Sequence, residues 1–351
     1  MKPFDNSFIT DYRSLTKDRK PDFGNILKIL NKEKPSRNTL FEFFLHGELE
    51  MWFTDTPVYP DNAFDVEQMR IHAFKAAGYD YCTLPASNFH FPHESSNHGK
   101  QSMSVNECSM IWDRESFEKY DWKNPDDFDC RLDRFEIPEG MKILIQGPSG
   151  VLENVTFLIG YNNLCYMLVD DPQLVQDVFD AVGSSLLRYY ELAVQHDCVG
   201  GIFSNDDWGF NTQTMLTIPD MRKYVFPWHK KIAEVAHNAN KPVILHSCGY
   251  FADIVDDIVD DMKFDGRHSY EDKIISVEDA YDKYADKFAI LGGLDLDFVC
   301  RSTPEEVYNR ACGMLERSKE KGGYGLGSGN SIPNYVPREN YLAMVAAATA
   351  N

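Results

Sequence analysis

A histidine and a cysteine stand two residues apart at the end of a short apolar run, Lys241 to Gly249 (KPVILHSCG). Successive side chains of a β-strand point to opposite faces, so His246 and Cys248 are expected to face the same way. Neutral imidazole and thiolate are both good ligands of a borderline-soft ion such as Zn²⁺. The pair therefore nominates a metal site with two protein ligands on one rigid element.

The same two residues also have a purely structural interpretation. A histidine can be a hydrogen-bonded core residue, and a cysteine is often a small buried hydrophobe. The choice between the two interpretations depends on where the pair lies in the fold, and hence on the surrounding elements.

Short apolar or β-branched runs alternate with longer amphipathic stretches along most of the chain. Eight runs predict strands: 39–45, 79–84, 142–146, 199–204, 242–246, 264–268, 288–291 and 323–326. Helices are predicted over 23–30, 64–77, 172–195, 219–238, 251–262, 276–284, 304–321 and 337–350. Strand then helix, repeated about eight times over roughly 250 to 350 residues, is typical of an α/β fold of the (β/α)₈ TIM-barrel type; a doubly wound open sheet is the alternative.

We expect residues 1–351 to form a single domain of this kind. Residues 1–38 add an N-terminal helical segment before the first strand. Residues 88–140 break the rhythm after the second strand with polar and aromatic sequence. We expect this stretch to be an excursion of loop and short helix over the barrel mouth.

In such barrels the chemistry collects at the carboxyl ends of the strands, where the βα loops converge. Polar residues follow nearly every predicted strand. A loop acid alone is often an ordinary loop residue or a helix cap, and we favour one of these two roles for Asp206 and Asp297. As catalytic candidates we take Asp207, Glu153, His268 and Asp295, and as substrate-binding candidates His46, Glu48, Ser328 and Asn330.

Composition narrows the class of protein. The chain has 351 residues, of which 43% are hydrophobic and 26% charged, and a net charge of −20. Such acidity argues against binding to nucleic acid or to anionic membranes, both of which rely on clustered Lys and Arg. The sequence lacks a signal-peptide pattern and a spanning apolar run, and its eight scattered cysteines are typical of reduced thiols. We therefore expect a cytoplasmic globular protein.

Several motifs carry a likeness to a known family: GPSG at 147–150, NDDW at 205–208, LHSCG at 245–249, LGGLD at 291–295, TPEEV at 303–307 and GGYGLGSGNSIP at 322–333. In these the chain resembles the uroporphyrinogen decarboxylase superfamily. Its members include decarboxylases of porphyrin synthesis and zinc-dependent methyltransferases that work with corrinoid proteins. The resemblance implies a TIM barrel and one of these two activities.

The decarboxylase branch carries an arginine-rich segment after the first strand, which binds the carboxylates of the substrate. Here the first strand runs into His46-Gly47-Glu48-Leu49-Glu50, and no arginine occurs between Arg37 and Arg70. Guanidinium groups are the natural partners of carboxylates. This departure argues against a porphyrin substrate.

The methyltransferase branch has a zinc motif of His-x-Cys at the fifth strand and a second Cys between glycines at the eighth. His246 and Cys248 match the first part, whereas Ser328 stands at the position of the second Cys. A serine hydroxyl is a weak zinc ligand. Another residue must complete the metal shell, with Glu153, Asp207 and His268 as candidates, or the metal is weakly bound or absent.

The resemblance and the motif together favour a methyltransferase that moves a methyl group between a small substrate and the corrinoid of a separate partner protein, with Zn²⁺ at His246 and Cys248. One alternative is a decarboxylase of the same superfamily, and another is a catalytically silent ligand-binding barrel. The sequence leaves the oligomeric state open; a homodimer is the common arrangement.

Overall fold

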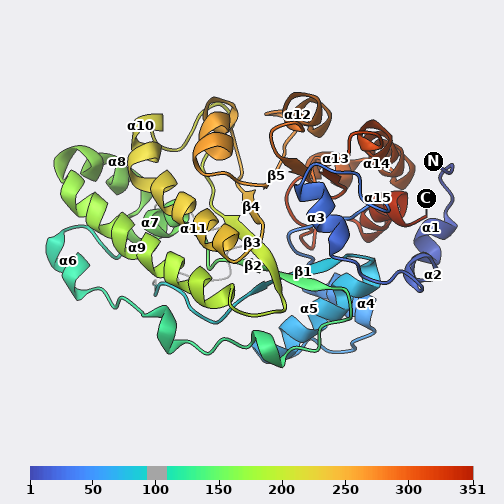
Figure 1. Cartoon of the computed structure of the whole chain (residues 1–351), viewed down its shortest axis with the longest axis horizontal. Helices are drawn as coiled ribbons and strands as arrows, with labels where there is room; N and C mark the ends of the chain where they lie inside the picture. Colours follow the sequence, from blue (N-terminus) through green and yellow to red (C-terminus); the bar gives the residue numbers. More distant parts are fainter. Residues whose placement is uncertain (93–108, 351) are drawn as a thin grey trace.

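The computed structural model describes residues 1–92 and 109–350. In this part of the chain, seven parallel strands pair in sequence order and form one sheet. They are β1 (Tyr81–Pro85), β2 (Lys142–Gln146), β3 (Val199–Asn205), β4 (Val243–His246), β5 (Gly266–His268), β6 (Ala289–Leu291) and β7 (Tyr324–Gly325). Strands that pair in sequence order through helical crossovers are typical of a TIM-like fold. The sheet therefore confirms the α/β class (Figure 1).

The helices lie outside the sheet, and most follow a strand along the chain (Figure 1). They are α1 (Ser7–Thr10), α2 (Tyr12–Thr16), α3 (Gly24–Leu30), α4 (Gly47–Thr54), α5 (Ala63–Ala77), α6 (Arg114–Lys119), α7 (Val151–Ile159), α8 (Tyr161–Asp170), α9 (Pro172–Ala193), α10 (Ile218–Asp220), α11 (Phe226–Asn238), α12 (Val277–Tyr284), α13 (Leu296–Arg301), α14 (Pro304–Ser318) and α15 (Arg338–Thr349). Short 3₁₀ and π turns complete the set: η1 (Pro125–Asp127), η2 (Leu132–Arg134), η3 (Met221–Val225), η4 (Ala252–Ile254) and η5 (Asp257–Asp261).

The predicted first strand, residues 39–45, forms isolated bridges instead of a ladder. Leu40 and Leu45 make single parallel bridges to Leu326 and Ile332, beyond β7. On its other side, the Tyr81 hydroxyl both accepts from the backbone N–H of Glu42 and donates to the Glu42 carbonyl, at 2.6 Å each. A side chain thus occupies the backbone groups that a regular ladder with β1 would use.

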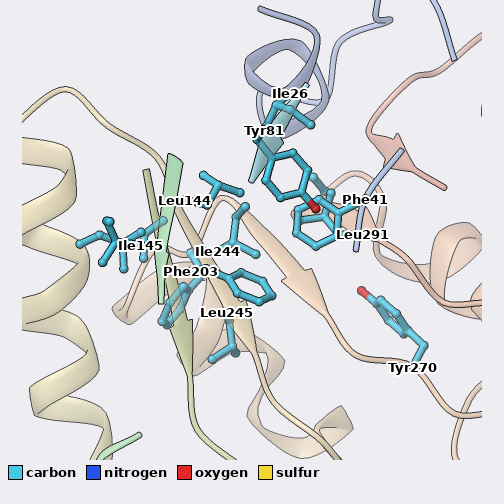
Figure 2. Close-up of a cluster of buried hydrophobic side chains, with 14 of the residues drawn as sticks. Ile26, Phe41, Tyr81, Leu144, Ile145, Phe203, Ile244, Leu245, Tyr270 and Leu291 are labelled. Atoms are coloured by element: carbon cyan, nitrogen blue, oxygen red, sulfur yellow. The ribbon is translucent and has the colours of Figure 1, made fainter. Parts of the chain in front are cut away.

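The core lies where the strands meet the segment before β1. Figure 2 shows Phe41, Tyr81, Leu144, Ile244 and Leu291 gathered in this cluster, and each of these side chains is completely buried. Burial of this kind contributes about 1.5–3 kcal/mol for each large apolar side chain. The core therefore provides a rigid support for the loops at the ends of the strands.

The described part of the predicted excursion, residues 109–140, runs along α9. Its Arg114 pairs with Asp177 near the start of that helix, and Asp126 pairs with Arg188 near its end. α6 is the short helix expected in this stretch. Residues 93–108 also belong to the stretch that we expect to pass over the barrel mouth, but they lie outside the described residues.

No helix in the two described ranges combines the length and the apolar character that a membrane crossing requires.

Candidate metal centre

Three side chains of the ligand-forming types converge at the carboxyl ends of β3 and β4. The two strands pair in parallel, with Asn205 opposite His246. The backbone N–H of Asp206 then donates to the His246 carbonyl at 2.9 Å, so the pairing extends one residue beyond β3. Asp207 and Cys248 follow directly in the two loops. The register of the sheet thereby brings Asp207, His246 and Cys248 together.

The possible ligand atoms of these three residues all lie within 4.8 Å of one another. Cys248 Sγ is 3.9 Å from His246 Nε2. The backbone N–H of Cys248 donates to Asp207 Oδ1 at 2.9 Å, which fixes the carboxylate against the other loop. His246 is buried, whereas Asp207 and Cys248 are half-buried. The sulfur of Cys248, a ring nitrogen of His246 and a carboxylate oxygen of Asp207 thus lie together at a partly solvent-exposed position.

A second histidine sets the tautomer of His246. His268 Nε2 lies 3.3 Å from the carbonyl oxygen of Ser328, which can only accept, so Nε2 carries the proton and His268 Nδ1 is bare. His246 Nδ1 lies 2.8 Å from that bare nitrogen and must donate to it. This leaves the lone pair of His246 on Nε2, the nitrogen that faces Cys248. His268 therefore orients the His246 ring from behind, as an outer partner of a metal-bound histidine does.

Burial keeps both rings neutral. It lowers the pKa of His246 well below its usual range, with a further contribution from His268, and it lowers the pKa of His268 to about 3. Burial, followed by the Asp207 carboxylate, raises the pKa of the Cys248 thiol well above its usual range. A thiol in these surroundings ionises when a cation compensates the charge, as metal binding does.

A buried arginine ties the loops that carry the site. Arg267 donates to the carbonyl oxygens of Ser247, at 2.8 Å, and of Ser269. Its guanidinium stacks on Phe251, 3.6 Å from the ring centroid. Because Arg267 is completely buried and binds both loops, it fixes the positions of the residues that flank Cys248.

Gly249 allows the turn after Cys248 to pack closely. Its φ of +84° lies in the left-handed region, and an added Cβ would lie 2.0 Å from the Gly209 carbonyl oxygen. A side chain at this position would therefore push the β3 and β4 loops apart.

The neighbouring acids Asp206 and Asp207 have different surroundings. The Asp206 carboxylate is completely buried and accepts from the backbone N–H groups of Leu152 and Glu153, at 2.9 Å each. It also accepts from Trp208 Nε1 at 3.0 Å and lies 2.8 Å from His229 Nε2. These bonds at the start of α7 match the structural role predicted for Asp206, whereas Asp207 lies with the candidate metal ligands.

Glu153 lies near this pair. Burial raises its pKa to about 8, with further contributions from the charges of Asp207 and Asp206. One oxygen of Glu153 accepts from the Gly150 N–H at 2.9 Å. At neutral pH this carboxyl group therefore holds a proton close to the candidate metal ligands.

Ser328, which stands where the related zinc motif has its second Cys, is engaged elsewhere. Its hydroxyl donates to Glu42 Oε1 at 2.7 Å, and its backbone N–H donates to Glu42 Oε2 at 3.1 Å. Burial raises the pKa of Glu42 to about 8. Both residues are completely buried. Instead, Asn330 reaches the sulfur: its Nδ2 lies 3.2 Å from Cys248 Sγ.

The remaining candidates, Asp295, His46 and Glu48, are not members of the three-residue group. Asp295 caps α13 by accepting from the Phe298 N–H at 3.0 Å, and its second oxygen accepts from the Asp272 N–H at 2.9 Å. This carboxylate therefore serves as a helix cap and not as a member of the cluster. His46 is half-buried and immediately precedes α4, and its Nδ1 has no hydrogen-bond partner among the described residues. Glu48 is exposed in the first turn of that helix.

Comparison with known proteins places this site in a family. The family model described as uroporphyrinogen decarboxylase (URO-D) matches residues 142–350, more than half of the chain. The chain belongs to the URO-D family. The matched range includes Asp207, His246, Cys248 and Ser328, but not Glu42. No curated protein sequence matches this URO-D chain.

One of the solved structures that match this URO-D protein superposes on nearly all of it. A methyltransferase from Methanosarcina mazei superposes with a TM-score of 0.68 at 16% identity, and the match covers 92% of this chain and 97% of that one. This identity shows a shared fold alone. An intracellular xylanase from Thermoanaerobacterium saccharolyticum matches with a TM-score of 0.32 at 11% identity, over 55% of this chain and 66% of that one, and carries no argument.

Proposed function

We propose that this protein is a methyltransferase that binds a metal ion through Asp207, His246 and Cys248. It would move a methyl group between the oxygen of a small substrate and the cobalt of a separate corrinoid protein. The observation that carries the proposal is the convergence of these three ligand atoms within 4.8 Å at the carboxyl ends of β3 and β4. The full-length likeness to a methyltransferase fold supports it.

The donor set fits Zn²⁺. Bonds of about 2.0–2.3 Å in a tetrahedral shell put neighbouring ligand atoms roughly 3.3–3.8 Å apart. The 3.9 Å between Cys248 Sγ and His246 Nε2 is close to this range. The lone pair of His246 already lies on Nε2, because His268 accepts the other ring proton. Three protein ligands would leave the fourth position to water or substrate, as in catalytic zinc sites.

The ligand types also favour a particular substrate. A shell with one thiolate and one carboxylate makes a harder Lewis acid than a shell with two thiolates. The ion would supply Lewis acidity toward an oxygen atom of the substrate. We therefore propose a substrate whose methyl group is bonded to oxygen, such as an alcohol or a methyl ether.

The chain's own groups complete the reaction. The partner's corrinoid would supply reduced cobalt, whose electron pair would form the new bond to the methyl carbon, while the C–O bond of the substrate would break with both electrons staying on oxygen. Glu153, whose pKa is raised by burial and by the neighbouring carboxylates, would be the donor of a proton to that oxygen. His46, Glu48 and Asn330 remain our candidates for contacts to the substrate.

Metal analysis and an assay test the proposal together. We expect about one zinc per chain in the wild type and a loss of zinc in Cys248→Ala and Asp207→Asn, with Cys165→Ala as a matched control because Cys165 is an exposed thiol. Reduced cobalamin would serve as the methyl acceptor, with methanol and methoxyphenol as donors. Equal zinc content in the wild type and Cys248→Ala would contradict the proposal.

Decarboxylation is the second candidate, favoured by the family itself and by the proton that Glu153 holds at neutral pH. The two functions differ in their need for metal. Release of CO₂ from a carboxylated substrate that survives chelation and the Cys248→Ala change would favour the decarboxylase.

A further inference from the structure

A second group of Cys, His and Asp lies near the opposite end of the sheet. Cys130 precedes η2, and His196 lies between α9 and the first residue of β3. Cys130 Sγ is 3.1 Å from His196 Nε2, and His196 Nδ1 is 2.8 Å from Asp133 Oδ2. The three side chains thus form a line of thiol, imidazole and carboxylate.

The line has the geometry of an activated nucleophile. The Asp133 carboxylate can only accept, so the nearby Nδ1 of His196 carries the ring proton when the ring is neutral. The lone pair on Nε2 then faces the Cys130 thiol. A nucleophile, a base in contact with it and a third group that orients the base are the three parts of this kind of site.

The group is reachable from solvent. The side chain of His196 is 20% exposed and that of Asp133 is 71% exposed, while Cys130 is half-buried. By contrast, Cys82 is completely buried. A small reagent can therefore approach Cys130 without an opening of the core.

Burial, with the carboxylates beside it, favours the protonated form of the Cys130 thiol. Burial raises the pKa of Cys130, and the carboxylates of Asp133 and Asp129 raise it further, although the Leu132 backbone N–H and Arg131 act against them. Arg131 pairs with Glu67 at 2.8 Å, and Asp129 pairs with Arg134 at 2.8 Å. Nearby, Cys198 Sγ contacts the Leu132 carbonyl at 3.7 Å, and Lys241 donates to the His196 carbonyl at 3.0 Å. Reaction at Cys130 consequently needs a base that takes the proton as the new bond forms.

We propose that Cys130 is a nucleophilic thiol for small hydroperoxides, with His196 as its base and Asp133 as a positioning residue. In the reaction, Sγ attacks the outer oxygen of the peroxide, an S–O bond forms and the O–O bond breaks. His196 Nε2 takes the thiol proton and returns it to the departing oxygen. Cys130 is oxidised to a sulfenic acid, and the peroxide is reduced to water or an alcohol.

The experiment follows sulfenic acid at each cysteine of the full-length protein. Hydrogen peroxide is the oxidant, dimedone traps the product, and mass spectrometry measures the rate at Cys130 and at the exposed Cys165 of the same molecule. We expect Cys130 to react at least tenfold faster than Cys165. We also expect His196→Gln to reduce the Cys130 rate at least tenfold, because a general base contributes about 10²–10⁴-fold.

Two further variants separate chemistry from loss of structure. Asp133→Glu should keep the Cys130 rate, whereas Asp133→Asn should lower it severalfold, since only the former retains the charge. Added imidazole should restore part of the rate in His196→Gly. A Cys130 rate at or below that of Cys165, or one that His196→Gln leaves unchanged relative to Cys165, would overturn the proposal.

Discussion

Two groups of the same three residue types lie near opposite ends of the sheet and have different shapes. At the carboxyl ends, Asp207, His246 and Cys248 converge, with their ligand atoms within 4.8 Å of one another. Near the amino ends, Cys130, His196 and Asp133 lie in a line, with contacts of 3.1 and 2.8 Å. A converging set can surround a cation, whereas a linear set can pass a proton.

The hydrogen-bond partner of each histidine determines which of these two chemistries its group can perform. His246 donates to His268, a neutral ring, so its free nitrogen can serve as a metal ligand beside a thiol and a carboxylate. His196 contacts Asp133, a carboxylate that accepts the Nδ1 proton and leaves Nε2 facing the thiol. Residue types alone therefore do not assign the chemistry of a Cys-His-Asp group; the order of contacts does.

The largest expected effect is on the free energy of unfolding. It should differ between Asp206, a buried neighbour of the first group, and Asp133, an exposed member of the second. Asp206→Ala should lower the free energy of unfolding by about 3–5 kcal/mol, because it leaves His229 and two helix N–H groups without their buried partner. Asp133→Ala should change it by less than about 0.5 kcal/mol, because Asp133 is mostly exposed. Urea denaturation of both variants measures the contrast, and equal losses would contradict it.

The buried Glu42, which binds Ser328 near the first group, should make the free energy of unfolding depend on pH, as an exposed carboxylate such as Asp133 should not. The pKa of the Glu42 carboxyl group is about 8 in the folded chain against an ordinary value of 4.5. Between these pH values the folded state keeps a proton that the unfolded state has released, so stability falls as pH rises through this window. The loss is on the order of a few kcal/mol. Glu42→Gln mimics the protonated group and should flatten this part of the profile; an unchanged slope would refute this assignment.

Removal of the group behind each histidine should affect one site and spare the other. His268→Ala should weaken zinc binding roughly 10–100-fold, the usual effect of losing an outer partner of a metal ligand. The same change should leave the Cys130 reaction with peroxide unaltered, and Asp133→Asn should have the reverse pattern. Competition with a zinc-chelating dye gives the affinity. A variant that impairs both sites would show that they are coupled.

The smallest effect concerns the bond to sulfur. Asn330→Ala removes a hydrogen bond to Cys248 Sγ worth about 0.5–1.5 kcal/mol. The affinity for zinc should therefore fall about two- to tenfold. Asn330→Asp would instead place a carboxyl group beside the thiol. Calorimetric titration with zinc compares the variants. A loss of zinc affinity as large as that in Cys248→Ala would contradict this secondary role and make Asn330 a ligand itself.

Much of the fold follows from local sequence. The run at 142–146 predicts β2 with its observed bounds, and Pro172 marks the start of α9. Residues 39–45 read as a strand because they are apolar, but the Tyr81 hydroxyl takes both backbone groups of Glu42. The predicted helix over 219–238 contains the wide turn η3, next to Pro227, whose ring nitrogen has no hydrogen to donate.

The site was predictable where strand geometry determines it. The spacing of His246 and Cys248 and their place at the carboxyl end of β4 are local features, and Asp207 was among the candidates for the third ligand. Sequence reasoning did not single out Asn330 as a partner of Cys248, or Arg267 as the tie between two loops. It also missed Cys130 and His196, which lie 66 residues apart, because only the packing of one segment along α9 brings them together.

The bond between Ser328 and Glu42 limits how this centre can evolve or be redesigned. A lone exchange of Ser328 for cysteine would set a larger sulfur atom against a carboxyl group inside the core, and so would add strain before it added a ligand. A route to a two-thiolate centre therefore has to pass through position 42 as well. These two positions, 286 residues apart, should be inherited as a unit.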